Sequence, residues 1–273
     1  IGGASSASAD QSVALATFEE YAIEASIAKI AGSETVDFVL DENIQIHGGN
    51  GYVRDYPAER HYRDGRVNRI FEGTNEINRL LIPGVIARRA AAGGLAIGDS
   101  VAGMESSDHR GIGASSHRVV GALGDRGVES SGDEPWAPEV AAVDGFKRAA
   151  LVVLGTAMQA YGTALPNQQE VLLHAADVLI DVFSAESALL RARAASGTAR
   201  GPLHADVARV FLHDAALRIA ASSRQALSAT IEGDELLSAL FELDTLLRPP
   251  LLNTAALRRR IADETVASGS YPL

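Results

Sequence analysis

A Gly- and Ser-rich interval divides this chain into two stretches whose apolar residues recur with helical spacing. The interval, 93–135, carries Asp, His and Arg without periodicity, which is typical of a linker. Neither flanking stretch contains a strand-rich segment. We therefore expect an all-α chain with one helical domain at 1–92 and a second helical bundle at 136–273.

Composition supports this reading and excludes several classes of partner. Hydrophobic residues make up 47% of the 273 residues and aromatic residues only 5%; Ala and Leu dominate, which favours helix-on-helix packing. The net charge of -11 argues against nucleic acid or an anionic membrane surface as a bulk partner. With no cysteine, disulfides and thiolate metal sites are excluded, and we expect no metal.

Targeting signals are weak. No apolar run approaches the length of a membrane span, and no signal-peptide pattern is present, so we expect no membrane insertion. We expect a cytoplasmic location if the protein is bacterial, with the mitochondrial matrix as the alternative. The chain begins with Ile1 rather than Met, which we interpret as a truncation or a processed end.

The first domain reads as three helices. One covers about 12–46, and its apolar stripe is Phe18, Ala22, Ala25, Ala28, Gly32, Val36, Val39 and Ile44. The small residues in this stripe suggest close approach of another helix, and the glycines after His47 end the pattern. Pro57 suits the first turn of a short helix to about Val67. A third helix starts near Asn75, and Pro83 would kink it or start a new one.

The second domain reads as a bundle of helices separated by Pro and Gly breaks. Its expected core stripes are Val143, Phe146, Ala150, Val153, Ala157 and Tyr161; Val171, Ala175, Val178, Val182 and Leu189; Val207, Val210, Phe211, Leu217 and Ala221; and Leu236, Leu237, Leu240, Phe241, Leu243 and Leu247. A basic helix with Arg258, Arg259 and Arg260 follows, which we interpret as a solvated face or an oligomer contact.

One carboxylate stands out. Glu72 lies between a hydrophobic run, which includes Ile70 and Phe71, and the step Gly73-Thr74. Gly73 lets backbone approach a ligand closely, Thr74 can cap the next helix, and the amides at that helix start can bind an anion or a carbonyl oxygen. Glu72 is therefore a candidate general base, with Ile70 and Phe71 buried beside it. The alternative is an ordinary acid favoured at a helix start.

Other polar residues of this region carry weaker signals. The glycines Gly48 and Gly49 would let backbone approach a phosphate, or they simply end a helix. They do not form a Rossmann-type fingerprint, because a helix rather than a strand precedes them. The group Arg63, Asp64 and Arg66 indicates a structural ion-pair cluster, with an interface as the alternative. His47 is more typical of a capping residue than of a catalytic one.

Four short motifs in order connect this region to a known family. They are Gln45, Gly48-Gly49-Asn50-Gly51, Arg63-Asp64-Gly65-Arg66 and Glu72-Gly73-Thr74. In this pattern the chain closely resembles the C-terminal domain of acyl-CoA dehydrogenases over about Phe18 to Ala90. Beyond that, its layout resembles the very-long-chain type with an extra C-terminal helical domain. The resemblance implies that the family's N-terminal helical domain and middle β-domain are absent from this chain.

The resemblance implies an activity and roles for particular residues. The activity is FAD-dependent α,β-dehydrogenation of acyl-CoA thioesters, of medium to very long chain, in fatty-acid β-oxidation. Glu72 would abstract the α-proton while the β-hydride goes to the flavin N5, and the Gly73 amide would contact the thioester carbonyl. The FAD-binding residues it implies, partly across a subunit boundary, are Gln45, Gly48, Gly49, Thr74 and Glu76. Glu76 stands where the family often has Gln, and it could accept a hydrogen bond from a ribose hydroxyl.

The resemblance also implies partners. These are an electron-transfer flavoprotein and a second copy of the chain, in a homodimer or homotetramer. Without the other two domains we expect an incomplete flavin site, an inactive fragment and an exposed apolar face on the first helix. The alternative is a non-catalytic subunit or assembly module that pairs with a partner carrying those domains, in which Glu72 is vestigial.

Overall fold

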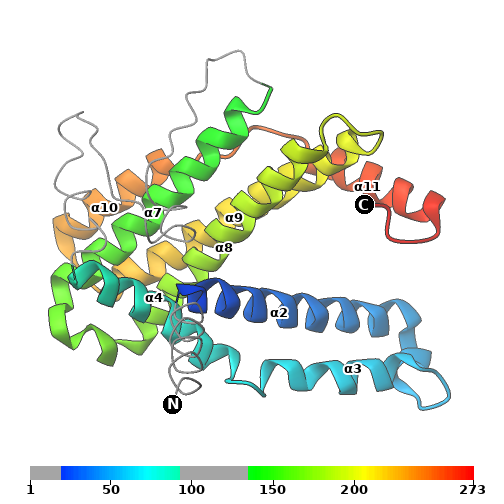
Figure 1. The fold of residues 1–273 in the computed structure, drawn as a ribbon, viewed down its shortest axis with the longest axis horizontal. Helices are drawn as coiled ribbons and strands as arrows, with labels where there is room; N and C mark the ends of the chain where they lie inside the picture. Colours follow the sequence, from blue (N-terminus) through cyan, green and yellow to red (C-terminus); the bar gives the residue numbers. More distant parts are fainter. Residues whose placement is uncertain (1–19, 93–134) are drawn as a thin grey trace, which may run out of the picture. The chain divides into compact units, whose positions relative to one another are not determined.

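The computed structural model describes residues 20–92 and 135–273, which are helical and contain no strand in those ranges (Figure 1). The all-α prediction is confirmed. The chain forms two compact units, Ile1–Val85 and Ile86–Leu273. The N-terminal residues 1–12 and the expected linker, apart from residue 135, lie outside the described residues.

Unit 1 is built on a long helix and a shorter one that run side by side (Figure 1). Its described elements are α2 (Ala22–His47), η1 (Gly48–Tyr52), α3 (Ala58–Arg66), η2 (Val67–Arg69) and the first part of α4 (Asn75–Ala91). Gly48, at φ 58°, ends α2. Gly65 of α3 is buried against Leu40 of α2, where a Cβ would collide with the leucine side chain, so glycine permits this close approach.

The predicted helix boundaries of unit 1 are largely confirmed. The glycines after His47 end α2, Pro57 precedes α3, and α4 starts at Asn75. Pro83 lies inside α4, and the helix continues past it to Ala91 instead of restarting.

Two faces of α2 differ in burial. Ile23, Ile27 and Ile30 of one face are fully buried, whereas Val36 and Val39 of the opposite face are 42% and 55% exposed. The exposed face carries the apolar stripe of the sequence analysis from Ala25 to Val39, in keeping with the expected lack of neighbours. The close helix approach predicted at Gly32 is wrong for the described residues, because a methyl group there would meet none of their atoms within 4 Å.

Unit 2 is a helical bundle in which α7 packs on both α8 and α9, and α8 and α9 pack together. Its elements are α7 (Ala137–Tyr161), η3 (Gly162–Asn167), α8 (Gln169–Ala195), α9 (Gly201–Ser228), α10 (Gly233–Leu246) and α11 (Thr254–Ser268). The stripes predicted for α7 and α8 are buried, apart from the half-buried Tyr161. The stripes predicted for α9 and α10 are partly wrong: Leu217 and Phe241 are exposed, and Leu212 and Ile219 face the core instead.

Ion pairs fasten α11 to α9. Both guanidinium nitrogens of Arg260 that face α9 donate to Asp206, at 2.7 and 2.9 Å, and Arg258 donates to Asp214 at 2.7 and 2.8 Å. Burial alone would raise the pKa of Asp214, but hydrogen bonds from Arg258 and His213 outweigh it and lower that pKa. All three arginines of this run are exposed, which confirms the interpretation as a solvated face. From that face Arg258 and Arg260 also pair with α9 of the same chain.

Candidate functional site

The candidate base lies in a turn of unusual backbone conformation between η2 and α4. Glu72 has φ 56° and is the one described non-glycine residue with positive φ, and Gly73 follows at φ 77°. The left-handed region costs an ordinary L-residue about 1–2 kcal/mol, so surrounding contacts must hold Glu72 there. Strain of this kind concentrates at functional sites.

Thr74 caps the helix that follows, as predicted. Its hydroxyl oxygen accepts a hydrogen bond from the Ile77 N–H at 3.3 Å. The pKa of Glu76 is lowered first by a hydrogen bond from its own N–H and then by one from the Thr74 hydroxyl, with Arg79 and Arg69 adding positive charge. The first turn of α4 therefore already holds a carboxylate. Glu76 suits a partner that donates hydrogen bonds, such as a sugar hydroxyl, better than a phosphate.

A polar network on α2 supports the turn at Glu72 and Gly73. Lys29 Nζ donates to the Gly73 carbonyl at 2.8 Å and to Asn75 Oδ1 at 2.7 Å. Asn75 is fully buried and donates from Nδ2 to Ser33 Oγ and to Glu34 Oε1, both at 3.0 Å. The buried amide is thus satisfied on both sides, as a buried polar group must be.

Two ion pairs extend this network along α2. Arg79 donates to both carboxylate oxygens of Glu34, at 2.6 and 2.9 Å, and Arg69 donates to Asp37 at 2.7 Å. Burial alone would raise the pKa of Glu34, but the hydrogen bonds and charge of Arg79, helped by Asn75, lower it below its ordinary value. Together these contacts fix the 69–79 segment on the middle of α2.

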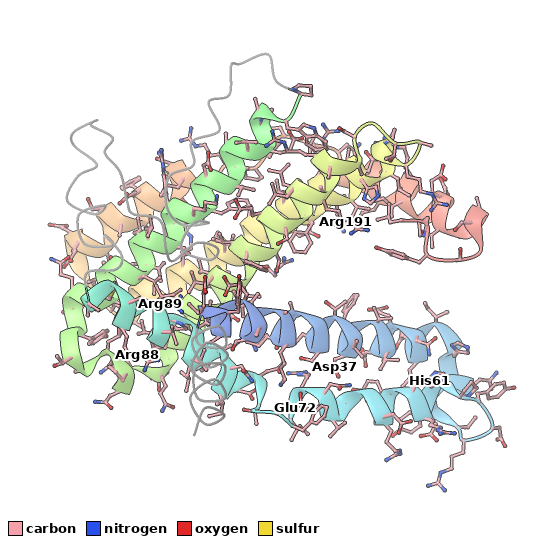
Figure 2. The ribbon with its side chains drawn as sticks, in the orientation of Figure 1. Asp37, His61, Glu72, Arg88, Arg89 and Arg191 are labelled. Atoms are coloured by element: carbon pink, nitrogen blue, oxygen red, sulfur yellow. The ribbon has the colours of Figure 1, made fainter. Side chains whose placement is uncertain are left out.

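The surroundings of Glu72 differ from the prediction. Ile70 and Phe71 are 55% and 46% exposed, so the expectation that they are buried beside Glu72 is wrong for this chain. Glu72 is itself exposed and has no hydrogen-bond or ion-pair partner within the described residues. Figure 2 labels Glu72 in the segment that joins η2 to α4. The described part of unit 1 therefore holds the backbone that carries the Glu72 carboxylate, but it forms no apolar cleft around that carboxylate.

The other predicted binding residues lie at the far end of α2. Gln45 is in the last turn of that helix, and Gly48 and Gly49 begin η1. Ser33 touches Asn75, and Gln45 lies twelve residues further along, so the two groups are about 18 Å apart at 1.5 Å per residue. One small group such as a pyrophosphate cannot touch both groups in one copy of the chain.

The glycine turn at the end of α2 is open. A Cβ added at Gly48 or Gly49 would meet nothing within 4 Å, so described side chains leave this backbone accessible. The neighbouring His47 uses Nδ1 in a 2.8 Å contact with the Asn43 carbonyl, which fits the structural role expected for it.

The arginines of α3 pair within their own helix. Arg63 contacts Glu59 at 3.5 Å, and Arg60 contacts Asp64 at 3.6 Å. The predicted cluster of Arg63, Asp64 and Arg66 is therefore wrong in its partners, because each paired residue finds its mate four positions away on the helix surface.

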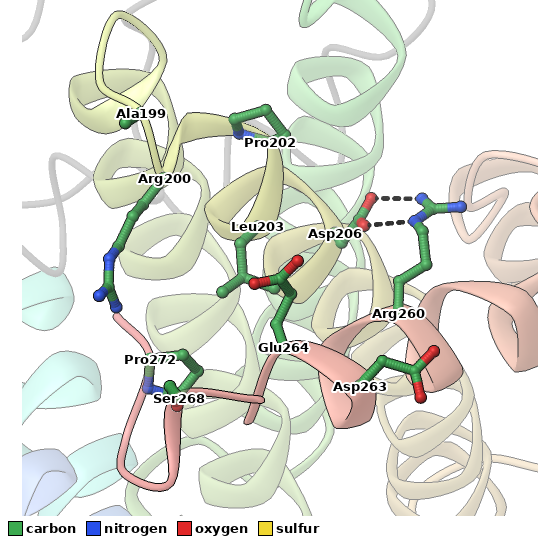
Figure 3. Close-up of a pocket in the computed structure, with 10 residues that line it drawn as sticks. All are labelled: Ala199, Arg200, Pro202, Leu203, Asp206, Arg260, Asp263, Glu264, Ser268 and Pro272. Carbon is green, nitrogen blue, oxygen red and sulfur yellow. Dashed lines mark hydrogen bonds and ion pairs between the residues drawn. The ribbon is translucent and has the colours of Figure 1, made fainter. Parts of the chain in front are cut away.

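Among the described residues, no group of His, Asp or Glu could hold a metal ion, and no helix is long and apolar enough to cross a membrane. In unit 2 a hollow of about 520 Å³ lies between the start of α9 and α11 (Figure 3). Its charged lining includes the paired Asp206 and Arg260, with Asp263 and Glu264 of α11 (Figure 3).

Comparison with known proteins gives a consistent result for both units. Residues 4–87 match a family model described as "Acyl-CoA dehydrogenase, C-terminal domain", and residues 145–244 match another with the same description. A probable acyl-CoA dehydrogenase of Bacillus subtilis (strain 168) is 37% identical over 246 residues, which are 89% of this chain and 39% of that protein. The human mitochondrial short-chain specific acyl-CoA dehydrogenase is 54% identical over 65 residues, 24% of this chain and 16% of that protein.

A solved structure is similar over nearly the whole chain. It is the crystal structure of an acyl-CoA dehydrogenase complexed with FAD from Bacillus anthracis, with a TM-score of 0.77 and 35% sequence identity. The similarity covers 92% of this chain and 41% of that one. This chain therefore spans about two fifths of the length of the relatives that it matches over most of its residues.

Proposed function

This chain belongs to the acyl-CoA dehydrogenase family, and we propose that it is the C-terminal part of an enzyme that oxidises acyl-CoA thioesters to their α,β-unsaturated products. The observation that carries the proposal is the Glu72–Gly73 turn. Two successive residues with positive φ present a carboxylate that has no partner within the described residues, while Lys29 and Asn78 behind them hold the Gly73 carbonyl by hydrogen bonds.

In this proposal Glu72 takes the α-proton of the substrate at its carboxylate oxygen. The Gly73 N–H donates to the thioester carbonyl oxygen and stabilises the negative charge that develops there. This N–H has no backbone partner among the described residues, whereas the Gly73 carbonyl is held by Lys29 and Asn78, at 2.8 and 2.9 Å. One side of the glycine is therefore anchored, and the other is available to a ligand.

The residues of unit 1 fit FAD as the cofactor. The open backbone at Gly48 and Gly49 and the exposed Gln45 side chain suit an extended polar ligand, while Thr74 and Glu76 suit its hydroxyl groups. FAD, when bound, accepts the hydride that leaves the substrate β-carbon. The 18 Å spacing estimated above supports contacts of the two groups with different parts of the cofactor, or with cofactors in two copies of the chain.

The substrate range and partners form part of the same proposal. We assign medium to very long acyl chains, a place in fatty-acid β-oxidation and an electron-transfer flavoprotein as the acceptor of electrons. The exposed Phe38, Val39 and Ile46 support assembly into a homodimer or homotetramer, because apolar surface of this kind commonly marks an interface. The chain by itself would be inactive, since it spans about two fifths of its longer-matching relatives.

The test is flavin content and acyl-CoA-dependent bleaching of the complete gene product, beside a Glu72→Gln variant. Gln keeps the shape of the side chain and removes the base. The proposal predicts that the parent bleaches, and that the variant binds FAD in equal amount and does not bleach. Equal bleaching of both proteins would place the base elsewhere.

A parent protein that binds no FAD would favour the alternative function, a non-catalytic subunit or assembly module. The exposure of Ile70, Phe71 and Glu72 in this chain is the observation that supports that alternative. Pull-down of a chain that carries the missing domains would then be the next measurement.

A further inference from the structure

The polar network under the candidate catalytic turn includes Lys29 of α2, whose ammonium group contacts the turn itself. We propose that Lys29 is a positioning residue: its ammonium group, by bridging the Gly73 carbonyl and the Asn75 side chain, holds the turn that aims the Glu72 carboxylate and the Gly73 N–H. The catalytic part of this inference rests on the proposed function, whereas the structural part stands on the contacts alone.

The first argument is the geometry at Gly73. Its carbonyl accepts from Lys29 Nζ at 2.8 Å and from Asn78 Nδ2 at 2.9 Å. Two donors from different helices fix the plane of the peptide that follows Gly73. The peptide before Gly73 carries the Gly73 N–H, and it is joined to the held peptide through the backbone dihedral angles of Gly73, whose φ is positive like that of Glu72. Fixing the carbonyl of Gly73 therefore also limits how its N–H can turn. Lys29 is the donor that ties this turn to α2.

The second argument is the orientation of Asn75. Lys29 can only donate a hydrogen bond, and the ionised Glu34 can only accept one. They flank the buried Asn75 amide at 2.7 Å from Oδ1 and 3.0 Å from Nδ2. A flipped amide would face an ammonium with its NH₂ and a carboxylate with its oxygen. Lys29 therefore also fixes the orientation of the side-chain amide of Asn75, the first residue of α4.

The third argument is the choice of a lysine at this position. The chain has 24 Lys and Arg residues, and only Lys29 and Lys147 are lysines. A lysine ammonium is a compact point charge with three donors that rotate freely, whereas an arginine guanidinium is a planar fork suited to carboxylates. The two acceptors of Lys29 are a carbonyl and an amide oxygen from different parts of the chain, which a compact donor matches better.

Loss of Lys29 would release a strained turn. The Gly73 carbonyl would keep one donor, and the left-handed conformation of Glu72, which costs about 1–2 kcal/mol, would lose part of its support. A displacement of about 1 Å at a catalytic group can cost about 100-fold in rate. We therefore expect an effect on the rate of flavin reduction rather than on the amount of flavin bound.

The experiment compares three variants of the complete gene product: Lys29→Met, Lys29→Arg and, as a matched control, Lys147→Met. Lys147 makes the other lysine contact of the chain, with Glu186 in unit 2 at 2.7 Å. Readouts are FAD stoichiometry, the affinity for acyl-CoA, the single-turnover rate of flavin reduction, and backbone amide exchange of a peptide that covers 70–78.

The expected result is specific to Lys29→Met. Its flavin reduction slows about 100-fold and its 70–78 amides exchange faster, while FAD content and acyl-CoA affinity stay within about twofold. Lys29→Arg recovers part of the rate, and Lys147→Met changes neither the rate nor this exchange. Unchanged reduction and unchanged exchange in a folded Lys29→Met protein would overturn the inference, as would an equal slowing in Lys147→Met.

A second variant covers the case in which Lys29→Met fails to fold. Asn78→Ala removes the other donor to the Gly73 carbonyl without touching the buried Asn75 side chain, and it should slow flavin reduction in the same way. An unaltered rate there would overturn the inference. If the parent itself is not reduced by any acyl-CoA, the proposed function fails, and the exchange comparison of Lys29→Met with the parent still decides whether Lys29 holds the turn.

Discussion

Arg79 of α4 holds both carboxylate oxygens of Glu34 on α2, at 2.6 and 2.9 Å. This is the paired geometry in which arginine binds carboxylates most strongly. It stabilises the charged form of Glu34, whose pKa is lowered even though burial acts to raise it. The pair is thus a contact between α2 and α4 whose strength depends on pH.

The first prediction concerns this dependence. A carboxylate whose pKa is lower in the folded than in the unfolded state adds stability above its ordinary pKa of 4.5, and that stability is lost as the pH falls through the folded-state value. Glu34→Gln should therefore lower the free energy of unfolding by about 1 kcal/mol at pH 7. The difference from the parent should vanish under strongly acidic conditions. Urea unfolding followed by circular dichroism, at a series of pH values, checks both statements.

Asp37→Asn is the control for the Glu34 prediction. Asp37 faces Arg69 from the same helix at 2.7 Å through one oxygen, so its loss removes a single contact rather than a paired one. A Glu34→Gln variant as stable as the parent at pH 7 would mean that the Arg79 pair contributes nothing net.

A second prediction separates strain from chemistry at Glu72. Its φ of 56° suits glycine and costs another residue about 1–2 kcal/mol. Glycine also makes the unfolded chain more flexible, which lowers the free energy of unfolding by roughly 0.5–1 kcal/mol. Glu72→Gly should therefore be at least as stable as the parent while flavin reduction is lost. Glu72→Gln should lose reduction with no gain in stability. Thermal unfolding and single-turnover flavin reduction of both variants measure the two effects, and a destabilised Glu72→Gly would argue against a strained turn.

The fold was predictable to the extent that local residues decide it. Gly48 and Pro57 mark helix boundaries through their backbone restrictions, and the structure places boundaries there. The buried stripes of α7 and α8 were also found from spacing. In α9 the spacing favours Leu217 as a core residue, whereas the structure exposes Leu217 and buries Ile219. That helix packs against α8, α7, α10 and α11, so apolar residues on several faces compete and periodicity alone cannot choose.

The candidate site was predictable only in its sequence-local part. Spacing of the motifs singled out Glu72, Gly73 and Thr74, and the cap by Thr74 is present. Lys29, Ser33 and Asn75 were missed, because their signal is the meeting of residues more than forty positions apart. Lys29 and Ser33 are polar residues four positions apart on a long helix. Such a pair cannot be told from a solvent-exposed helix face until the residue that packs against it, here Asn75, is known. The apolar cover of Glu72 was predicted from local sequence, although it depends on surfaces that the described residues do not supply.

A third prediction uses glycine to test the packing of α10 on α7. A Cβ at Gly145 would collide with the backbone carbonyl of Leu246, whereas at Gly32 it would meet nothing within 4 Å. Gly145→Ala should destabilise unit 2 by about 2 kcal/mol, since backbone cannot move aside as a side chain can. Gly32→Ala should stabilise α2 by about 0.5–1 kcal/mol through helix propensity. Chemical unfolding of both variants measures the two changes in the free energy of unfolding, which should have opposite signs. If neither variant changes that free energy, α10 does not pack closely at Gly145.

The last prediction concerns the ion pair between the buried Glu139, at the start of α7, and the half-buried Arg209. Arg209 Nε donates to Glu139 Oε1 at 2.6 Å, and Glu139 Oε2 is buried with no partner among the described residues. The guanidinium also lies 5.5 Å from the Trp136 ring centroid. Removing one member of such a pair leaves an uncompensated buried charge, so Arg209→Met should cost about 3 kcal/mol.

Replacing both members should cost less than replacing Arg209 alone. In the double variant Glu139→Leu with Arg209→Met no charge stays buried, so part of the lost stability should return. A double-mutant cycle on the free energy of unfolding measures the coupling of the two side chains. If the double variant is instead less stable than Arg209→Met, the pair with Glu139 is not what Arg209 supports, and packing of its stem against Trp136 becomes the stabilising contact.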